Sequence, residues 1–235
     1  MIPLRDDVAA RTTPLVTVTL IALNAVVFLY QASLGLGTEH RAAEAFVFEF
    51  GVIPCRLSGA CPAPLEFPSP AATIFTSMFM HGGLLHVGGN MLYLWIFGDN
   101  VEDTLGHGRF LLFYLLSGVA AALGQTAVNP ASAIPMIGAS GAVSGVLGAY
   151  LLLFPYATIQ TLFMFGFFVR FIRVPALIVL GFWIVLQLIN GYITYSATVM
   201  GRPEAGGVAW FAHVGGFLAG IALLFLLKPR RKARL

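Results

Sequence analysis

Charged side chains are scarce in this sequence, and this scarcity is the first indication of where the protein resides. Only 10% of the 235 residues are charged, whereas 58% are hydrophobic. A soluble domain carries about 25% charged residues. No charged residue occurs between Arg109 and Arg170, and a large soluble core is a poor explanation for a charge-free stretch of that length. The composition therefore predicts a polytopic membrane protein.

Signals for secretion and for metal binding are also missing. The polar N-terminal stretch MIPLRDDVAARTTP is not followed by a short apolar run with a cleavage site, so we expect no cleaved signal peptide. No HExxH zinc signature occurs. A metal site built on His81, His86 and His213 is disfavoured, because His81 and His86 are poorly spaced for one helical face. Since no repeat or second domain is visible, we expect one membrane-embedded domain over residues 1–235.

Cysteine is nearly absent. Cys55 and Cys61 lie in a loop that contains proline and glycine. They would form a disulfide if this loop faces an oxidising compartment, and two free thiols are an equally acceptable interpretation. A metal pair is less favoured, because no other cysteine or histidine neighbours them.

Charge-free windows locate the predicted membrane spans, each of which needs about 20 apolar residues. The longest window is divided by Asn129-Pro130 and Pro135, which are typical of a turn. Six helices are predicted, at residues 15–34, 74–97, 110–128, 139–154, 174–194 and 207–227. The apolar piece 157–169 is too short for a span, so it is interpreted as an interfacial segment or the lead-in to span five, with a seventh span as the minor alternative. The predicted fold class is an all-α, six-helix membrane bundle with a large external loop, 35–70, between the first two helices.

Basic residues indicate the orientation of the bundle. An even number of spans places both termini on one side. If that side is the cytoplasm, ten Lys and Arg residues lie inside and three outside, in agreement with the positive-inside rule. The C-terminal run KPRRKARL is then a cytoplasmic flank rather than a nucleic-acid-binding patch. We expect a prokaryotic cell (inner) membrane, because the chain is short and carries no targeting segment.

Polar clusters interrupt three of the predicted spans. They are HGGLLHVGGN at 81–90, GASG at 138–141 and AHVGG at 212–216. Polar and ionisable groups inside a membrane are costly, so such residues are candidates for function. Spans two, four and six all run from outside to inside. His86, Asn90, Ser140 and His213 are therefore expected at similar depth, in the outer half of the membrane.

Small residues predict that spans four and six pack closely. Each span has a small-residue face, made of Gly141, Gly145 and Gly148 in one and of Ala212, Gly216 and Gly220 in the other. Small residues four apart let membrane helices approach backbone to backbone. Such packing would bring His213 near Ser140.

A serine near a histidine can act as a nucleophile. The histidine removes the hydroxyl proton and later protonates the leaving group. Ser140 is thus the candidate nucleophile and His213 the candidate base. With no acidic residue in the outer half of any span, the pair is expected to be a dyad held by packing. His86 and Asn90 share a helix face, and they are candidate oxyanion donors together with the free N–H of Ser140 at its helix start.

The remaining polar residues are given lesser roles. His81 is expected to make a structural hydrogen bond, into the external loop. Ser144 is expected to pack or to bond back to its own helix. Lone polar residues in spans are interpreted as interhelical hydrogen-bonding groups; they are Asn24, Gln125, Gln187 and Asn190. His40 and His107 fall in predicted loops and are given no role.

The order and spacing of these residues resemble the rhomboid family of intramembrane serine proteases. The matching patterns are H-x4-H-x3-N in span two, G-x-S-G in span four and A-H-x-x-G in span six. The run FGDNVED at 97–103, followed by GHGR at 106–109, is similar to the family segment between spans two and three. The resemblance implies a six-helix fold that hydrolyses a peptide bond of single-pass transmembrane protein substrates in the lipid bilayer. It implies no cofactor.

Carried over by position, the resemblance implies roles for individual residues. Ser140 and His213 match the catalytic dyad, and His86 and Asn90 match the oxyanion donors. The residues expected to be structural near the site are His81, Gly138, Gly141 and Gly216. Glu102 and Arg109 match structural positions in the segment after span two. Span five and the loop 195–207 match the region thought to move for substrate access.

The sequence departs from the family pattern at two places, and neither departure removes a catalytic group. Many members have Trp-Arg where this chain has Ala72-Thr73, and some have a tyrosine that packs on the catalytic histidine where this chain has Ser144. The alternative function is a non-catalytic rhomboid-like protein that binds membrane helices. Such relatives usually lack the serine or the histidine, and this chain has both.

Overall fold

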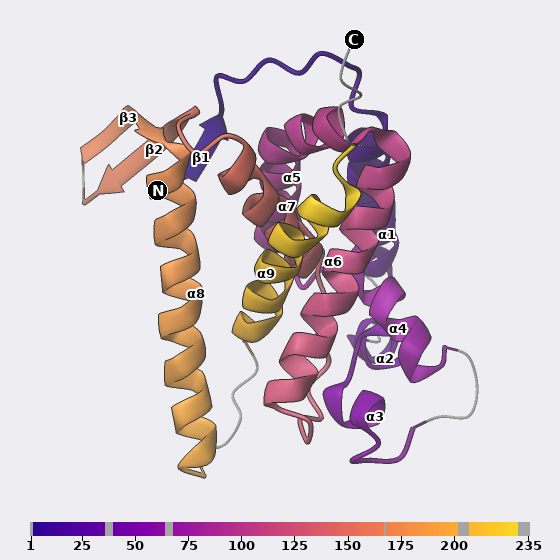
Figure 1. The fold of residues 1–235 in the computed structure, drawn as a ribbon. Helices are drawn as coiled ribbons and strands as arrows, with labels where there is room; N and C mark the ends of the chain where they lie inside the picture. Colours follow the sequence, from indigo (N-terminus) through magenta and orange to yellow (C-terminus); the bar gives the residue numbers. More distant parts are fainter. Residues whose placement is uncertain (1, 36–39, 64–67, 167, 202–206, 230–235) are drawn as a thin grey trace.

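The computed structural model describes residues 2–35, 40–63, 68–166, 168–201 and 207–229. Figure 1 shows a bundle of helices with a small sheet at one end. The long helices are α1 (Leu15–Gly35), α5 (Leu84–Leu105), α6 (His107–Val128), α7 (Ser140–Leu153), α8 (Ala176–Val199) and α9 (Trp210–Leu227). Three predicted features lie partly outside the described residues, namely the external loop 35–70, the access loop 195–207 and the basic C-terminal run.

Four of the described helices are long and apolar enough to cross a membrane: α1, α6, α8 and α9. Helix α7 is apolar but has only 14 residues, and α5 carries Asp99, Glu102 and Asp103 in its C-terminal part. The chain is therefore a mostly helical, polytopic membrane protein. Six membrane spans remain a prediction.

Shorter helices fill the region between α1 and α5. They are α2 (His40–Phe50), α3 (Pro54–Ser58), α4 (Pro70–Thr76) and a 3-10 turn at Ser77–Phe79. Local signals set their ends: the Ser69 hydroxyl accepts a hydrogen bond from the Ala72 N–H at the start of α4. Cys55 and Cys61 form a disulfide here, which decides between the two interpretations of this pair.

The second predicted helix, 74–97, begins too early and ends too early. The chain leaves helical structure after the 3-10 turn, and α5 starts only at Leu84, after Gly82-Gly83. At its other end α5 runs on to Leu105, because its acidic residues have partners in the N-terminal segment. Asp103 accepts hydrogen bonds from the Thr12 hydroxyl and the Arg11 N–H, at 2.7 and 3.3 Å. These contacts join residues that are far apart in the sequence.

Glu102 is a fully buried carboxylate that fixes the start of α1. It accepts hydrogen bonds from the N–H groups of Val16 and Thr17, at 2.9 and 2.8 Å, and from the Thr17 hydroxyl at 2.7 Å. The first N–H groups of a helix have no partner within it, and they favour a negative charge. His107, to which the sequence analysis gave no role, places Nδ1 2.6 Å from the same carboxylate. Arg109, two residues after His107, is exposed.

The fold is not all-helical, which corrects the predicted class. A three-stranded antiparallel sheet has the order β1 (Ile2–Arg5), β2 (Thr158–Phe165) and β3 (Phe168–Pro175). The described residues of 157–169 thus lie mostly in strands and form no seventh helix, and β3 leads directly into α8. Gly166, with φ of 56°, lies at the turn between β2 and β3. The second neighbour of β2 is a strand from the opposite end of the chain, so no local pattern reveals this pairing.

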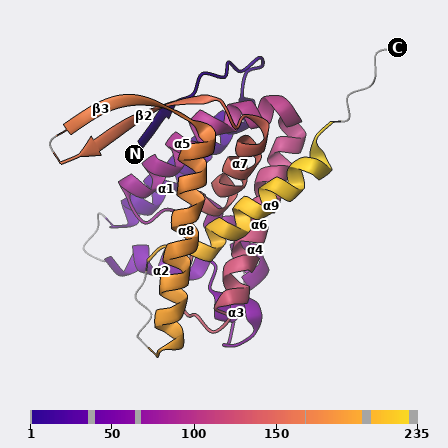
Figure 2. The same ribbon diagram turned by 60° about the vertical axis from the view of Figure 1, so that its left-hand side comes forward.

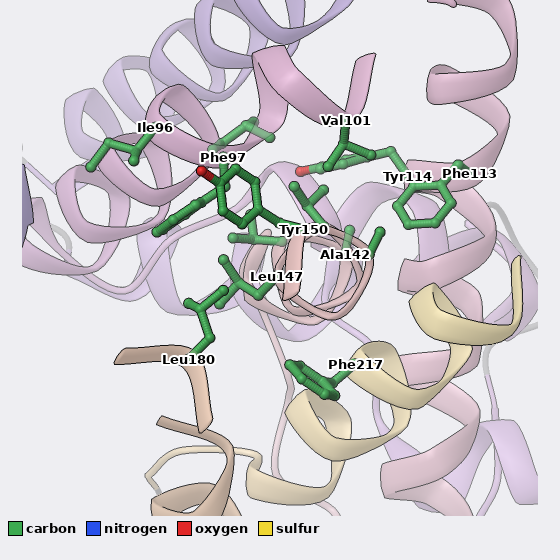
Figure 3. Close-up of a cluster of buried hydrophobic side chains, with 14 of the residues drawn as sticks. Ile96, Phe97, Val101, Phe113, Tyr114, Ala142, Leu147, Tyr150, Leu180 and Phe217 are labelled. Carbon is green, nitrogen blue, oxygen red and sulfur yellow. The ribbon is translucent and has the colours of Figure 1, made fainter. Parts of the chain in front are cut away.

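Helix α7 runs through the middle of the bundle (Figures 1 and 2). Its residues 141–150 are all buried. Figure 3 shows aromatic side chains from neighbouring helices around Tyr150, whose ring meets that of Phe97 edge to face at 4.8 Å. Helix α8 stands at the outside of the bundle (Figures 1 and 2), and few of its side chains are buried.

Candidate functional site

The site is built on the contact between α7 and α9, which is made by glycines. A Cβ on Gly216 would lie 2.0 Å from the carbonyl oxygen of Gly141, and a Cβ on Gly220 would lie 2.1 Å from that of Gly145. Gly141 is equally confined, since a Cβ there would lie 2.5 Å from the Cβ of Ala121 in α6. Only hydrogen fits at these positions, so the backbones of α7 and α9 touch.

This contact brings the predicted nucleophile and base together. Ser140 is the first residue of α7, and His213 lies in the first turn of α9. The distance between Ser140 Oγ and His213 Nε2 is 2.8 Å, which is a hydrogen bond. Both side chains are partly buried.

A third side chain, from α8, bonds to the other nitrogen of the imidazole. Gln187 Oε1 lies 2.8 Å from His213 Nδ1, and Gln187 is 5% exposed. The side-chain nitrogen of Gln187, Nε2, donates a hydrogen bond to the Trp183 carbonyl at 3.1 Å. The amide oxygen is therefore the acceptor, so His213 Nδ1 carries the proton and Nε2 is free to accept from Ser140.

Gln187 is the functional candidate that the sequence analysis missed. It was grouped with the lone polar residues of the spans, and His213 was expected to be held by packing alone. The rotation of α8 about its axis decides whether Gln187 faces His213 or lipid. A polar residue in an otherwise apolar span was the available signal, but it named no partner. By contrast, Asn190 on the same helix donates to the Leu186 carbonyl of that helix, at 2.7 Å, rather than across to another helix as predicted.

Two tryptophan rings also contact His213. The Trp183 ring lies 5.8 Å from the imidazole at 35°, and the Trp210 ring lies 6.3 Å away at 88°. Ser144, which replaces the tyrosine of some family members, donates to the Ser140 carbonyl at 2.6 Å, the back-bond that was predicted. Although Ser144 offers no ring to the imidazole, Trp183 of α8 and Trp210 of α9 supply aromatic neighbours.

His86 presents a ring nitrogen to the nucleophile's loop. Its Nδ1 accepts a hydrogen bond from the Gly82 N–H at 3.3 Å, so in the neutral ring Nε2 carries the proton. Gly138 has φ of 128°, and a Cβ there would lie 2.8 Å from His86 Nε2 and 3.6 Å from Ser140 Oγ. Glycine at 138 thus keeps the space between the His86 N–H and the serine hydroxyl open.

Asn90 supplies a second unused donor. It is 9% exposed, and its Nδ2 has no hydrogen-bond partner within the described part of the chain. A cavity of about 680 Å³ is lined by His86, Asn90, Ser140 and His213, among other residues. The N–H of Ser140 also lies at a helix start, where backbone donors are free. Three donors of different kinds therefore lie at the cavity wall that holds Ser140.

His81 does not bond into the external loop as expected. It is fully buried, and its Nε2 accepts from the Ala139 N–H at 3.4 Å, in the segment that leads into Ser140. Its backbone N–H and carbonyl both bond to the side chain of Gln31 in α1, at 3.2 and 2.9 Å. His81 bonds there because it lies in the break before α5, next to the loop before α7.

A side chain of α6 fixes the start of α9, the helix that carries His213. Gln125 Oε1 accepts hydrogen bonds from the N–H groups of Phe211 and Ala212, at 3.0 and 3.2 Å. Ala72-Thr73 lies in α4, where the Thr73 hydroxyl donates to the Pro70 carbonyl of its own turn. Among the described residues, no group of three His, Cys, Asp or Glu side chains is placed to hold a metal ion.

Comparison with known proteins gives a consistent set of similarities. A family model described as the Rhomboid domain matches residues 69–230. RHOMBOID-like protein 1 of Arabidopsis thaliana is 33% identical over 159 residues, which is 67% of this chain and 35% of that protein. Rhomboid protease GluP of Bacillus subtilis is 34% identical over 167 residues, 65% of this chain and 31% of that protein. Rhomboid protein 1, mitochondrial, of Saccharomyces cerevisiae is 30% identical over 165 residues, 66% of this chain and 42% of that protein. The matched part is less than half the length of each of these relatives.

Proposed function

This chain belongs to the rhomboid family, and from that premise we propose that it is an intramembrane serine endopeptidase. Its substrates are single-pass transmembrane proteins, cleaved in or near the membrane segment. The observation that carries the proposal is the 2.8 Å hydrogen bond between Ser140 Oγ and His213 Nε2, beside a cavity shared with His86 and Asn90. A relative that bears the name of a protease, GluP, supports the same reaction class.

The reaction begins when Ser140 Oγ attacks the carbonyl carbon of the substrate. His213 Nε2 accepts the hydroxyl proton as the bond forms, and the imidazolium then gives that proton to the amine that leaves. The product is an ester between Ser140 and the substrate's carbonyl group. A water molecule, deprotonated by the same nitrogen, hydrolyses the ester and regenerates the hydroxyl.

The negative charge of each tetrahedral intermediate forms on the substrate's carbonyl oxygen. His86 Nε2–H, Asn90 Nδ2–H and the Ser140 N–H are the donors for it. The unpaired state of Asn90 Nδ2 and the hydrogen bond that fixes the tautomer of His86 support this assignment. Since both side chains come from α5 and are already in place, little reorganisation accompanies the reaction.

Gln187 orients the base. An oxygen that accepts from His213 Nδ1 keeps the lone pair on Nε2, where Ser140 needs it. A neutral amide stabilises the imidazolium less than a carboxylate would, so the gain comes mainly from orientation and tautomer. The base is thus supported by one hydrogen bond and by two aromatic rings.

The substrate must offer a strand-like segment to this site. An intact helix hides its carbonyls in hydrogen bonds, so small or helix-breaking residues near the cut favour cleavage.

The predicted orientation places the site towards the outer face, with both termini in the cytoplasm. The Cys55–Cys61 disulfide on the outer side is consistent with that orientation. A prokaryotic cell membrane remains our expectation for its location, although relatives include a mitochondrial protein.

The test uses the full chain in liposomes with a fluorogenic single-span substrate. Ser140→Ala and His213→Ala should each abolish cleavage while the protein stays folded. Ser144→Ala is the matched control, because the Ser144 hydroxyl bonds only to its own helix, and it should cleave normally. Cleavage that persists in either dyad variant contradicts the proposal.

A second measurement separates an enzyme from a non-catalytic helix-binding relative. A fluorophosphonate probe should label the wild-type protein and should not label Ser140→Ala. Wild-type protein that binds the substrate but neither cleaves it nor reacts with the probe is a binding protein.

A further inference from the structure

The sheet is the part of the molecule that the catalytic proposal does not use. Figures 1 and 2 place it at the end of the bundle where α8 begins and α9 ends, with β2 and β3 running outward from the helices. At its base the sheet is packed against the bundle, where Pro3, Ile159 and Thr161 are buried. The turn end of β2 and β3 reaches beyond that contact.

Large apolar side chains near the turn are exposed. Met164 is 51%, Val169 57%, Phe171 66% and Phe168 73% exposed. Side chains alternate between the faces of a strand, and Val169 lies opposite Met164 in the register. Met164, Val169 and Phe171 therefore share one face, and Phe168 points from the other. Both faces of the turn end thus carry exposed apolar side chains, and the face of Phe168 also carries Arg170.

Basic side chains lie on the bundle side of this apolar end. Arg5, Gln160 and Arg173 stand side by side across the three strands, and Arg5 Nε donates to Gln160 Oε1 at 2.7 Å. Arg170 is also exposed, but it lies opposite Phe163, nearer the turn and on the other face of the sheet from Arg5 and Arg173. The acidic group facing this row is Asp7, whose charge interacts with Arg173. Two arginines against one exposed carboxylate leave the row cationic, and Arg170 adds a third positive charge near the turn.

We propose that the β2–β3 hairpin dips its turn end into the membrane interface beside the bundle and binds anionic phospholipid headgroups through Arg5, Arg170 and Arg173. The predicted orientation places this end of the bundle at the cytoplasmic leaflet, which carries the anionic lipids. An apolar end followed by a cationic row matches the sequence of acyl chain and phosphate that a lipid presents.

The distribution of apolar residues favours lipid over a protein partner. A protein docked on the sheet covers one face and leaves the other exposed to water. A strand added to the free edge of β3 covers neither face. Immersion at the depth of the headgroups covers both faces, and it leaves the unpaired edge N–H and C=O groups within reach of interfacial water. The inference rests on membrane embedding and not on the catalytic proposal.

The test measures hydrogen exchange of the full chain in nanodiscs that hold one copy each. One set contains phosphatidylcholine alone, and the other contains phosphatidylcholine with three parts in ten of phosphatidylglycerol. The outward N–H groups of the edge strand β3 should exchange more slowly in the anionic discs. Each arginine near an anionic surface contributes about fivefold in lipid binding, so Arg170→Gln/Arg173→Gln should remove most of the slowing.

The controls separate the outcomes. Arg109→Gln removes an exposed charge elsewhere on the chain and should leave the exchange unchanged. Phe168→Ser/Phe171→Ser should also remove the slowing, because it removes the inserted end. Equal exchange in the two lipid compositions overturns the proposal. So does slowing that survives the double arginine substitution, or slowing seen only in discs loaded with two copies, which would identify a second chain as the partner.

Discussion

The contact of α9 with α7 and the contact of α9 with α8 are built in opposite ways. Ten of the 14 residues of α7 are buried, against five of the 24 in α8. Glycines hold α7 and α9 at backbone distance, whereas α8 reaches the dyad through Gln187 and Trp183. Ser140 and His213 thus lie on two tightly packed helices, and Gln187, which bonds to the imidazole, comes from a helix outside that contact.

One part of the site is therefore fixed by backbone packing, and another part depends on a neighbouring helix. The distance between Ser140 and His213 follows from packing that tolerates no added atom. The tautomer of His213 follows from a single hydrogen bond made by a helix whose apolar surface is largely exposed. The two properties can therefore be changed separately.

The largest effect is expected where the rigid contact is broken. Gly216→Ala would place a Cβ 2.0 Å from the Gly141 oxygen, so α9 must move away from α7. We expect a loss of about 1–3 kcal/mol in unfolding free energy, as for other overpacked contacts. Because a shift of about 1 Å can cost 100-fold in rate, cleavage should fall at least that far. Denaturant unfolding in micelles and the liposome assay measure the two effects.

Gly181→Ala on α8 is the matched control, because nothing lies within 4 Å of the added Cβ. It should be neutral or slightly stabilising, since alanine favours a helix over glycine. Equal losses in the two variants would mean that α8 is as tightly constrained as the contact between α7 and α9.

A smaller effect is expected where the orienting bond is removed. Gln187→Ala should lower kcat by about 10- to 100-fold, because the imidazole loses its fixed tautomer while the rest of the machinery stays. Since Gln187 is not among the residues that line the cavity, KM should change little. Gln187→Glu keeps an acceptor, so it should recover much of the activity and alter the pH profile of kcat.

Asn190→Ala is the control for Gln187, because Asn190 lies one turn away and bonds within its own helix. It should change kcat less than about twofold. If Gln187→Glu were as poor as Gln187→Ala, or Asn190→Ala equally damaging, the side chain would be structural and not a positioning residue.

The smallest effect concerns the sheet at the start of α8. Asp7 accepts a hydrogen bond from the Thr158 N–H at 2.8 Å. This bond, with Arg173 nearby, holds the pKa of Asp7 below its ordinary value of 3.8. Asp7 therefore contributes stability that is present above pH 3.8 and is lost as the pH falls through the lowered pKa. Asp7→Asn should flatten the fall in melting temperature between pH 5 and pH 3, by about a few degrees at most.

For the neighbouring Asp6, we expect stability to change with pH in the opposite direction. Burial raises the pKa of Asp6 above 3.8, although the hydrogen bond from the Tyr150 hydroxyl opposes the rise. The contribution of Asp6 is thus full below pH 3.8 and is lost as the pH rises through the raised pKa. Melting curves of Asp6→Asn and Asp7→Asn should therefore differ from the wild type in opposite directions with pH. Identical pH dependence in both variants would contradict this assignment.

The parts of the site that could be predicted are those set by short-range spacing. Small residues four apart on two spans predicted that α7 and α9 touch, and the glycine contacts confirm this packing. The same pattern led to the expectation that Ser140 and His213 meet. Their catalytic roles stay a prediction until the substitutions are made.

The parts that could not be predicted depend on partners distant in the sequence. Helix α5 extends to Leu105 because α1 and its preceding residues bond to Glu102 and Asp103. Strand β2 forms because β1, more than 150 residues away, pairs with it. The role of Gln187 depends on how α8 is rotated, and an apolar helix with lipid on most sides has no strong periodicity to reveal that rotation.

In the proposed reaction, the hydrogen bond from His213 to Gln187 also makes the orientation of the imidazole depend on the packing of α8 against α9. Its two ends belong to α9 and α8, so a substrate that wedges these helices apart separates the imidazole from its acceptor. The ring is then free to turn, and Nε2 no longer stays aligned with the serine. Hydrolysis would resume only after α8 has moved back towards α9 while the unwound substrate segment stays bound in the site. Discrimination between membrane proteins would then lie in how long each one lets the helices stay together, in addition to the residues around its cleaved bond.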